Sequence, residues 1–108
     1  MSNLIHVDDN SLDALLESDL PVLVDFSAVW CGPCLRMEPI LETFASNYIG
    51  RVLVVKVNIE ESPKMSAKYN IRAVPTLILF NKGKLVWSKT GLVPMEVLES
   101  ALGITIKD

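Results

Sequence analysis

The feature that most constrains the fold is a junction between a strand-like segment and a helix-like segment, which contains both cysteines of the chain. Before the junction, Pro21–Phe26 is mostly apolar and β-branched, which is typical of a strand. After it, apolar residues recur at helical spacing as far as Tyr48, and Gly50 is suited to stop a helix. We therefore expect Cys31 and Cys34 to lie where a strand gives way to a helix.

The rest of the chain alternates strand-like and helix-like segments, which predicts an α/β fold. Arg51–Ile59 is nearly continuous in β-branched residues, as a parallel strand covered on both faces is. Ser62–Pro63 predicts an N-cap followed by a proline in the first helical position. The order βαβαβ, then α, then ββα predicts a single domain over residues 1–108, with parallel first strands, an antiparallel C-terminal hairpin and helices on both faces. The predicted strands are Leu4–Val7, Pro21–Ala28, Arg51–Ile59, Val74–Phe80 and Leu85–Thr90, and the predicted helices are Leu12–Leu16, Cys34–Tyr48, Pro63–Tyr69 and Pro94–Leu102, the last ended by Gly103.

Composition and charge exclude several classes of function. At 108 residues and 50% hydrophobic, the chain is long enough to bury one core. Its net charge is −3, and its lysines and arginines are scattered along the sequence. A nucleic-acid interface needs a clustered basic face. No apolar run reaches the roughly 20 residues of a membrane helix, and the first residues do not resemble a secretory signal. We expect a cytoplasmic monomer that binds neither nucleic acid nor membrane.

The two cysteines suit thiol–disulfide exchange. Cys31 falls at or just before the helix N-terminus, where unpaired N–H groups and the helix dipole favour a thiolate, the attacking species in such exchange. Cys34 falls on the apolar helix face and is expected to point inward, as a resolving thiol would. Pro33 has no N–H to leave unpaired in the first turn.

Other interpretations of the cysteine pair have less support. A zinc site needs four ligands, and beyond the two cysteines only His6 is available, far away in sequence. A second alternative is two ordinary buried cysteines that lie three positions apart. A disulfide closing so short a loop constrains the unfolded chain very little, so a purely stabilising role is disfavoured. The strand-to-helix context favours redox use.

Further residues carry a resemblance to a known family. Asp25-Phe26, Trp30-Cys-Gly-Pro-Cys34, Pro39, Lys56 and Ile71-Arg-Ala-Val-Pro-Thr76 stand in the order and spacing of thioredoxin, as do Gly83 and Gly91. The resemblance implies a thioredoxin fold, with a central five-stranded mixed sheet and four helices. It also implies a dithiol–disulfide cycle that reduces protein disulfides, with electrons from NADPH through thioredoxin reductase and no bound cofactor or metal. Thioredoxin reductase and disulfide-containing client proteins are the implied partners.

The resemblance also implies roles for individual residues. Cys31 is the expected nucleophile and Cys34 the resolving cysteine. Asp25, in a strand expected to be covered on both faces, should be buried with a raised pKa and should accept the proton of Cys34. Lys56 matches a position next to this carboxylate and could tune it, and Pro75 is expected to follow a cis peptide bond. The residues expected to bind substrate are Trp30, Gly32, Pro33, Ile59, Val74, Pro75, Gly91 and Leu92.

Two positions depart from the family pattern. Ser27 stands where a second tryptophan is usual, and Leu35 stands where a lysine commonly follows the motif. These departures concern substrate preference and redox poise more than the type of reaction. A docking or regulatory module for one partner is an alternative function, and a dithiol oxidant or isomerase of the same fold is another. Gly32-Pro33 between the cysteines resembles the reducing members.

Overall fold

The computed structural model describes residues 2–106, which form a five-stranded mixed sheet and four helices. The strand order is β1-β3-β2-β4-β5, in which β1, β3 and β2 are parallel, and β4 and β5 are antiparallel. The predicted fold class is therefore confirmed. The strands are β1 (Ile5–Val7), β2 (Val22–Ser27), β3 (Leu53–Asn58), β4 (Thr76–Asn81) and β5 (Lys84–Thr90), and the helices are α1 (Leu12–Leu16), α2 (Gly32–Asn47), α3 (Pro63–Lys68) and α4 (Met95–Ile106).

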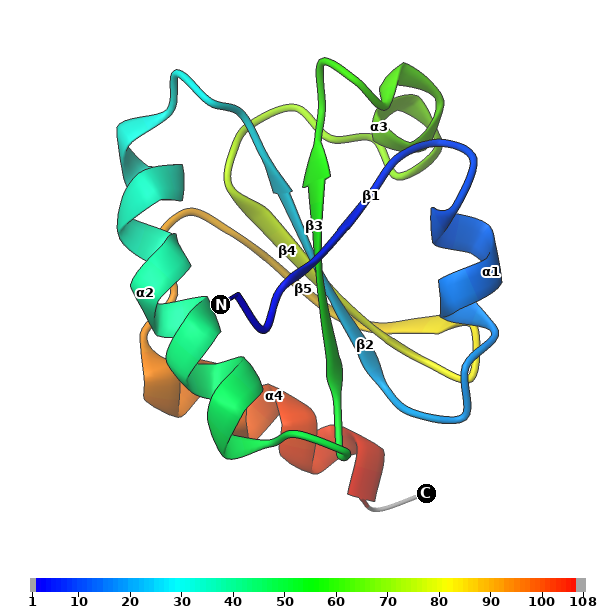
Figure 1. The fold of residues 1–108 in the computed structure, drawn as a ribbon, viewed down its shortest axis with the longest axis vertical. Coiled ribbons are helices and arrows are strands. Elements are labelled where there is room, and N and C mark those ends of the chain that lie inside the picture. The colour runs from blue at the N-terminus through cyan, green and yellow to red at the C-terminus, as the bar shows by residue number, and fades with distance from the viewer. Residues whose placement is uncertain (1, 107–108) are drawn as a thin grey trace.

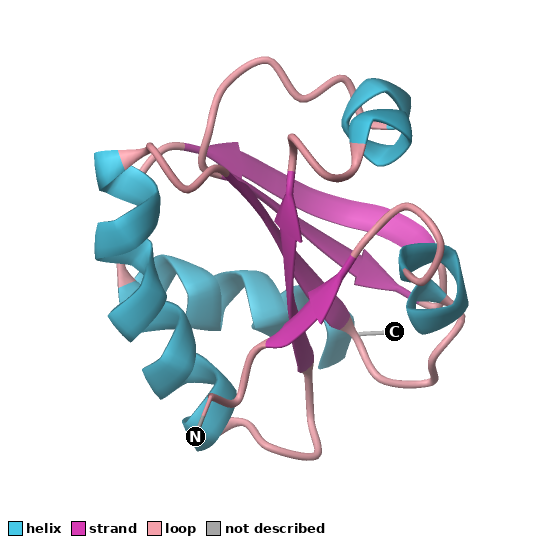
Figure 2. Cartoon of the chain, turned by 45° about the horizontal axis from the view of Figure 1, so that its top comes forward, coloured by secondary structure: helices cyan, strands magenta, loops and turns pink. Residues whose placement is uncertain are grey.

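The helices cover both faces of the sheet. Figure 1 shows α2 and α4 on one side and α1 and α3 on the other, and Figure 2 shows the same layers from a second direction. Each side has its own core, because successive strand residues point to opposite faces. Along β2, Val24 and Phe26 face the core under α1 and α3, whereas Leu23 faces the core under α2 and α4. No helix among residues 2–106 is long and apolar enough to cross a membrane.

The turns follow from local backbone chemistry. Lys82 and Gly83 both have positive φ angles, 54° and 81°, as the two-residue turn that matches the twist of a β-hairpin requires. Asn70, just past α3, has a φ of 54°, which asparagine tolerates better than most residues. The turn at Lys82 and Gly83 joins β4 to β5, and the turn at Asn70 ends α3. Both lie where the sequence predicts.

One predicted helix end needs correction, and one predicted helix start is confirmed. The prediction that Gly103 ends the last helix is wrong, since α4 continues to Ile106. A glycine inside a helix costs only about 1 kcal/mol, and packing of the preceding turn against the sheet outweighs it. Ser62 is the N-cap residue of α3, but its side chain makes no capping hydrogen bond. The carboxylate of Asp9 instead accepts from the N–H groups of Lys64 and Met65 at 3.0 and 2.9 Å.

Residues buried between α2 and the sheet should contribute far more to the free energy of unfolding than exposed residues of the same region. Leu41 is fully buried there, so Leu41→Ala should lower the free energy of unfolding by about 2–5 kcal/mol through lost burial and the cavity left behind. Ile49 is exposed, and Ile49→Ala should change it by less than about 0.5 kcal/mol. Urea unfolding of both variants measures the difference. Equal losses would contradict this account of the core.

Candidate active site

A disulfide joins Cys31 and Cys34 at the N-terminus of α2, with their Cα atoms 5.2 Å apart. Cys31 is the N-cap residue, and its sulfur accepts a hydrogen bond from the backbone N–H of Cys34 at 3.1 Å. The predicted position at a strand-to-helix junction is confirmed. Cys31 is 5% exposed and Cys34 1%, so the second cysteine points inward as expected. A helix N-terminus and a donated N–H both stabilise negative charge on the Cys31 sulfur when the disulfide is reduced.

The loop before β4 lies against this disulfide. The Val74–Pro75 peptide bond is cis, as the resemblance implied. The carbonyl oxygen of Val74 lies 3.7 Å from the Cys31 sulfur, and in the reduced protein the Cys31 thiol can donate to it. The carbonyl of Pro75 accepts from the N–H of Gly91 at 2.8 Å, which brings the end of β5 to the same edge. Residues 74, 75 and 91 therefore lie together beside the cysteines.

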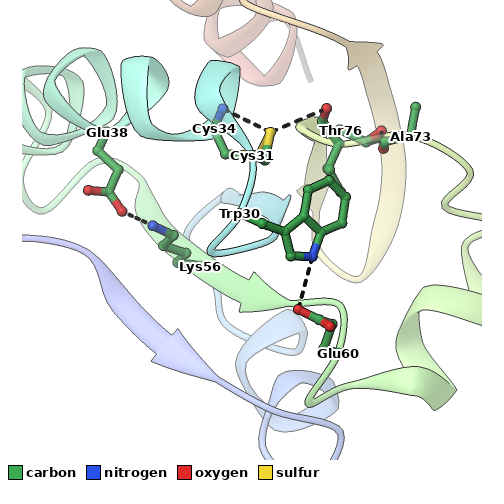
Figure 3. The surroundings of a disulfide bond; sticks show 9 residues. Trp30, Cys31, Cys34, Glu38, Lys56, Glu60, Ala73 and Thr76 are labelled. Carbon is green, nitrogen blue, oxygen red and sulfur yellow. Dashed lines mark hydrogen bonds and ion pairs between the residues drawn. A yellow bond between two sulfur atoms is a disulfide. The ribbon is translucent and has the colours of Figure 1, made fainter.

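Trp30 lies at the surface next to the disulfide. It is 66% exposed, and its indole N–H donates to the carboxylate of Glu60 at 3.1 Å (Figure 3). Sequence reasoning missed Glu60. A signal was available, because both residues follow the ends of adjacent parallel strands, and Ser27 pairs with Asn58 in that register.

Asp25 is buried in the central strand β2, as predicted. Among the described residues, neither of its carboxylate oxygens has a hydrogen-bond partner. Burial raises the pKa of Asp25 from 3.8 to about 7, and the nearby positive charge of Lys56 opposes this rise. The predicted direction of the pKa change is therefore confirmed. A carboxyl group that titrates near neutral pH can both take up and release a proton.

Lys56 pairs in register with Asp25 on the neighbouring strand β3. Its ammonium group, however, forms an ion pair with the carboxylate of Glu38 from α2 (Figure 3). Glu38 lies one helical turn after Cys34 and was not identified from the sequence. The structure therefore places a second carboxylate beside Lys56 that the resemblance did not imply.

Two cavities flank the cysteine pair. One, of about 240 Å³, includes three of the expected substrate-binding residues, and the other, of about 300 Å³, includes both departures from the family pattern. The smaller is lined by Trp30, Ile59, Ile71, Arg72, Ala73 and Val74. The larger is lined by His6, Val7, Ser27, Ala28, Val29, Cys34, Leu35, Glu38, Lys56, Asn58 and Glu61.

The other expected substrate-binding residues lie around this region without lining the smaller cavity. Gly32 is exposed and Pro33 partly buried in the first turn of α2, while Pro75 is buried and Leu92 is exposed. Within residues 2–106, no group of three or more His, Cys, Asp or Glu side chains is placed to hold a metal ion.

Comparisons with known proteins decide the family. The sequence matches the family model described as Thioredoxin over residues 3–103. Thioredoxin 1 of Nostoc sp. (strain PCC 7120 / SAG 25.82 / UTEX 2576) is 43% identical over 94% of this chain and 96% of that protein. The thioredoxin of Synechocystis sp. (strain ATCC 27184 / PCC 6803 / Kazusa) is 44% identical over the same shares, and that of Alicyclobacillus acidocaldarius is 44% identical over 87% and 90%. The chain belongs to the thioredoxin family.

Thioredoxins are thiol–disulfide oxidoreductases, and the geometry of this chain agrees with that activity. The Cys31–Cys34 disulfide is the redox-active pair of a protein-disulfide reductase. Ser27 and Leu35, the two positions expected to depart from the family pattern, both line the larger cavity beside Cys34.

The raised pKa of Asp25 should make stability depend on pH. Since the folded state holds this proton up to about pH 7 and the unfolded chain only to about 3.8, stability falls as pH rises between these values and then levels off. Asp25→Asn removes the cost of ionising a buried carboxyl group. The free energy of unfolding of this variant should exceed that of the parent by roughly 2–4 kcal/mol at pH 8, and the two should differ little at pH 4.

Urea unfolding of the disulfide form at pH 4, 6 and 8 measures this difference. Asp19→Asn is a matched control, because Asp19 is exposed and the chemical change is the same. A gain for Asp25→Asn that does not vary with pH would contradict the pKa assigned to Asp25.

Proposed function

We propose that this thioredoxin is a general reductant of protein disulfides, in which Cys31 attacks, Cys34 resolves and Asp25 accepts a proton. The observation that carries the proposal is the position of the Cys31 sulfur. It caps the N-terminus of α2 and accepts the N–H of Cys34, and Cys31 is the more exposed of the two cysteines, 5% against 1%. These features favour Cys31 as the sulfur that meets a client disulfide first.

The first step is capture of the client. The Cys31 thiolate attacks one sulfur of the client disulfide, a mixed disulfide forms, and the other client sulfur leaves as a thiolate. Trp30, Ile59 and Val74 line an apolar cavity next to Cys31 that suits the chain flanking the client cysteine. The backbone of Val74 is available to pair with an extended client segment, as in strand addition. Gly32, Pro33, Pro75, Gly91 and Leu92 complete the proposed contact region.

The second step releases the client. The carboxylate of Asp25 takes the proton of the Cys34 thiol, directly or through water, and the Cys34 thiolate attacks the Cys31 sulfur of the mixed disulfide. The Cys31–Cys34 disulfide forms, and the second client sulfur leaves as a thiolate. The client has gained two electrons, which this chain must recover before the next cycle.

Recycling requires a partner that supplies two electrons. We assign this role to a thioredoxin reductase that draws electrons from NADPH, because the Cys31–Cys34 disulfide must be reduced to restore the dithiol. A cytoplasmic location fits such a reducing partner. A monomeric state is consistent with one chain containing every group used in the two steps. Cytoplasmic location and monomeric state both remain predictions.

Serine variants of the two cysteines test the cycle. Cys31→Ser should abolish NADPH oxidation in the presence of insulin and thioredoxin reductase, since no thiolate attacks the client. Cys34→Ser should also stop turnover, but it should accumulate a mixed disulfide between Cys31 and insulin, because nothing resolves it. Non-reducing electrophoresis and mass spectrometry detect that adduct. Turnover by Cys31→Ser, or an adduct through Cys34 in that variant, would contradict the assigned order.

A further inference from the structure

Lys56 faces two carboxylates but binds only one of them. In-register neighbours on adjacent strands share a face of the sheet, and the register runs from His6 on β1 through Lys56 on β3 to Asp25 on β2. Helix α2 covers this face, and Glu38 projects from it toward Lys56, as Figure 3 shows. The Lys56 ammonium pairs with Glu38, while both oxygens of Asp25 have no hydrogen-bond partner among the described residues.

The difference in exposure explains this choice of partner. The side chains of Lys56 and Glu38 are 17% and 41% exposed, and both line the larger cavity. The pair therefore keeps part of its hydration while gaining its mutual attraction. A pair between Lys56 and Asp25 would be buried more deeply, and the desolvation of two charges offsets much of the attraction in such a pair. Glu38 offers the ammonium group a partner that costs less desolvation.

We propose that Glu38 is a positioning residue that holds the Lys56 ammonium on the α2 side of the cavity and so keeps it from pairing with Asp25. Without that hold, Lys56 would move toward the unpaired carboxylate and stabilise its charged form. The Asp25 carboxyl group would then be a weaker base toward Cys34 than it is in the native arrangement. The consequence for turnover rests on the proton-accepting role proposed above, whereas the effect on Asp25 does not.

Other charged or titratable groups lie near this region and must stay unchanged between the variants in which Asp25 is titrated. From α2 these are the two cysteines, which do not titrate while joined in the disulfide. From α4, Glu99 bonds to the hydroxyl of Tyr48 at the other end of α2 and does not line the larger cavity. The remaining groups are His6 on β1, Glu61 after β3 and Lys89, which pairs in register with Leu77 at the far edge of the sheet.

The test is a titration of the Asp25 carboxyl group in the disulfide form, followed by carbon-13 NMR of labelled aspartate. Glu38→Gln keeps the shape of the side chain and removes its charge, so it should lower the Asp25 titration midpoint by at least about 0.5 pH units. Glu42→Gln is the matched control. It makes the same charge change one turn later on α2, where Glu42 bonds to Ser2 and Asn3, and it should leave the midpoint within about 0.2 pH units.

A second background shows whether Glu38 acts through Lys56. Lys56→Met removes the ammonium and should raise the Asp25 midpoint. In this background Glu38→Gln should lower the midpoint by less than half as much, because only its direct charge effect remains. Each titration is repeated with His6→Gln, since His6 pairs in register with Lys56 on the same face. An unchanged or raised midpoint in Glu38→Gln, or an equal lowering in both backgrounds, would overturn the proposal.

Turnover separates this inference from the proposed function. If Asp25 accepts the proton of Cys34, the acid limb of insulin reduction by Glu38→Gln should move to lower pH together with the Asp25 midpoint. A midpoint that moves while the acid limb stays fixed supports the positioning role of Glu38 and contradicts the role proposed for Asp25. A fixed midpoint overturns the positioning role whatever the turnover shows.

Discussion

The central strand β2 is the constraint on which the rest of the structure depends. It pairs with β3 on one edge and β4 on the other, and all six of its residues are buried. Its direction is therefore fixed by hydrogen bonds on both sides and by a core on each face. Because β2 ends within a few residues of α2, this rigid strand determines where the helix begins. The position of the redox-active cysteines therefore follows from the position of β2 in the sheet.

The same constraint explains why the pair is asymmetric. A helix that begins directly after β2 makes Cys31 its N-cap, with the sulfur near unpaired N–H groups. Three residues later, Cys34 is turned toward the sheet and lies close to the residues that β2 and β3 present on that face. Both cysteines are buried, but only Cys31 occupies the N-cap position that favours a thiolate when the disulfide is reduced. The difference between the two thiols follows from one helical turn.

Much of this architecture could be predicted from the sequence, because it depends on local patterns. The alternation along β2 indicates which residues face each core, and the strand-to-helix junction locates the cysteines. Gly103 shows the limit of such patterns. Glycine commonly ends a helix, but it does so by adopting a positive φ, and whether the chain takes that conformation depends on packing that the sequence alone does not show.

The contacts missing from the sequence analysis cross between elements far apart in the chain. Glu60 reaches Trp30 across the ends of two parallel strands, and Glu38 reaches Lys56 across a helix and a strand. A resemblance carries over only positions that match the family motif, so a residue outside that motif, such as Glu38, receives no role from it. Its importance appears only when the strand register and the covering helix are known together.

The Asp25 carboxyl group has no hydrogen-bond partner among the described residues, and this lowers the stability of the fold when the group ionises. A buried carboxyl group with no hydrogen-bond partner destabilises the fold once it ionises, and a nearby lysine offers an obvious remedy. The register brings Lys56 near enough to oppose the rise of the Asp25 pKa, yet the Asp25 oxygens have no hydrogen-bond partner among the described residues. The lysine is instead paired with Glu38 of α2. On the proposal that Glu38 holds Lys56 away, the Asp25 carboxyl group keeps the high pKa that its proposed role toward Cys34 requires.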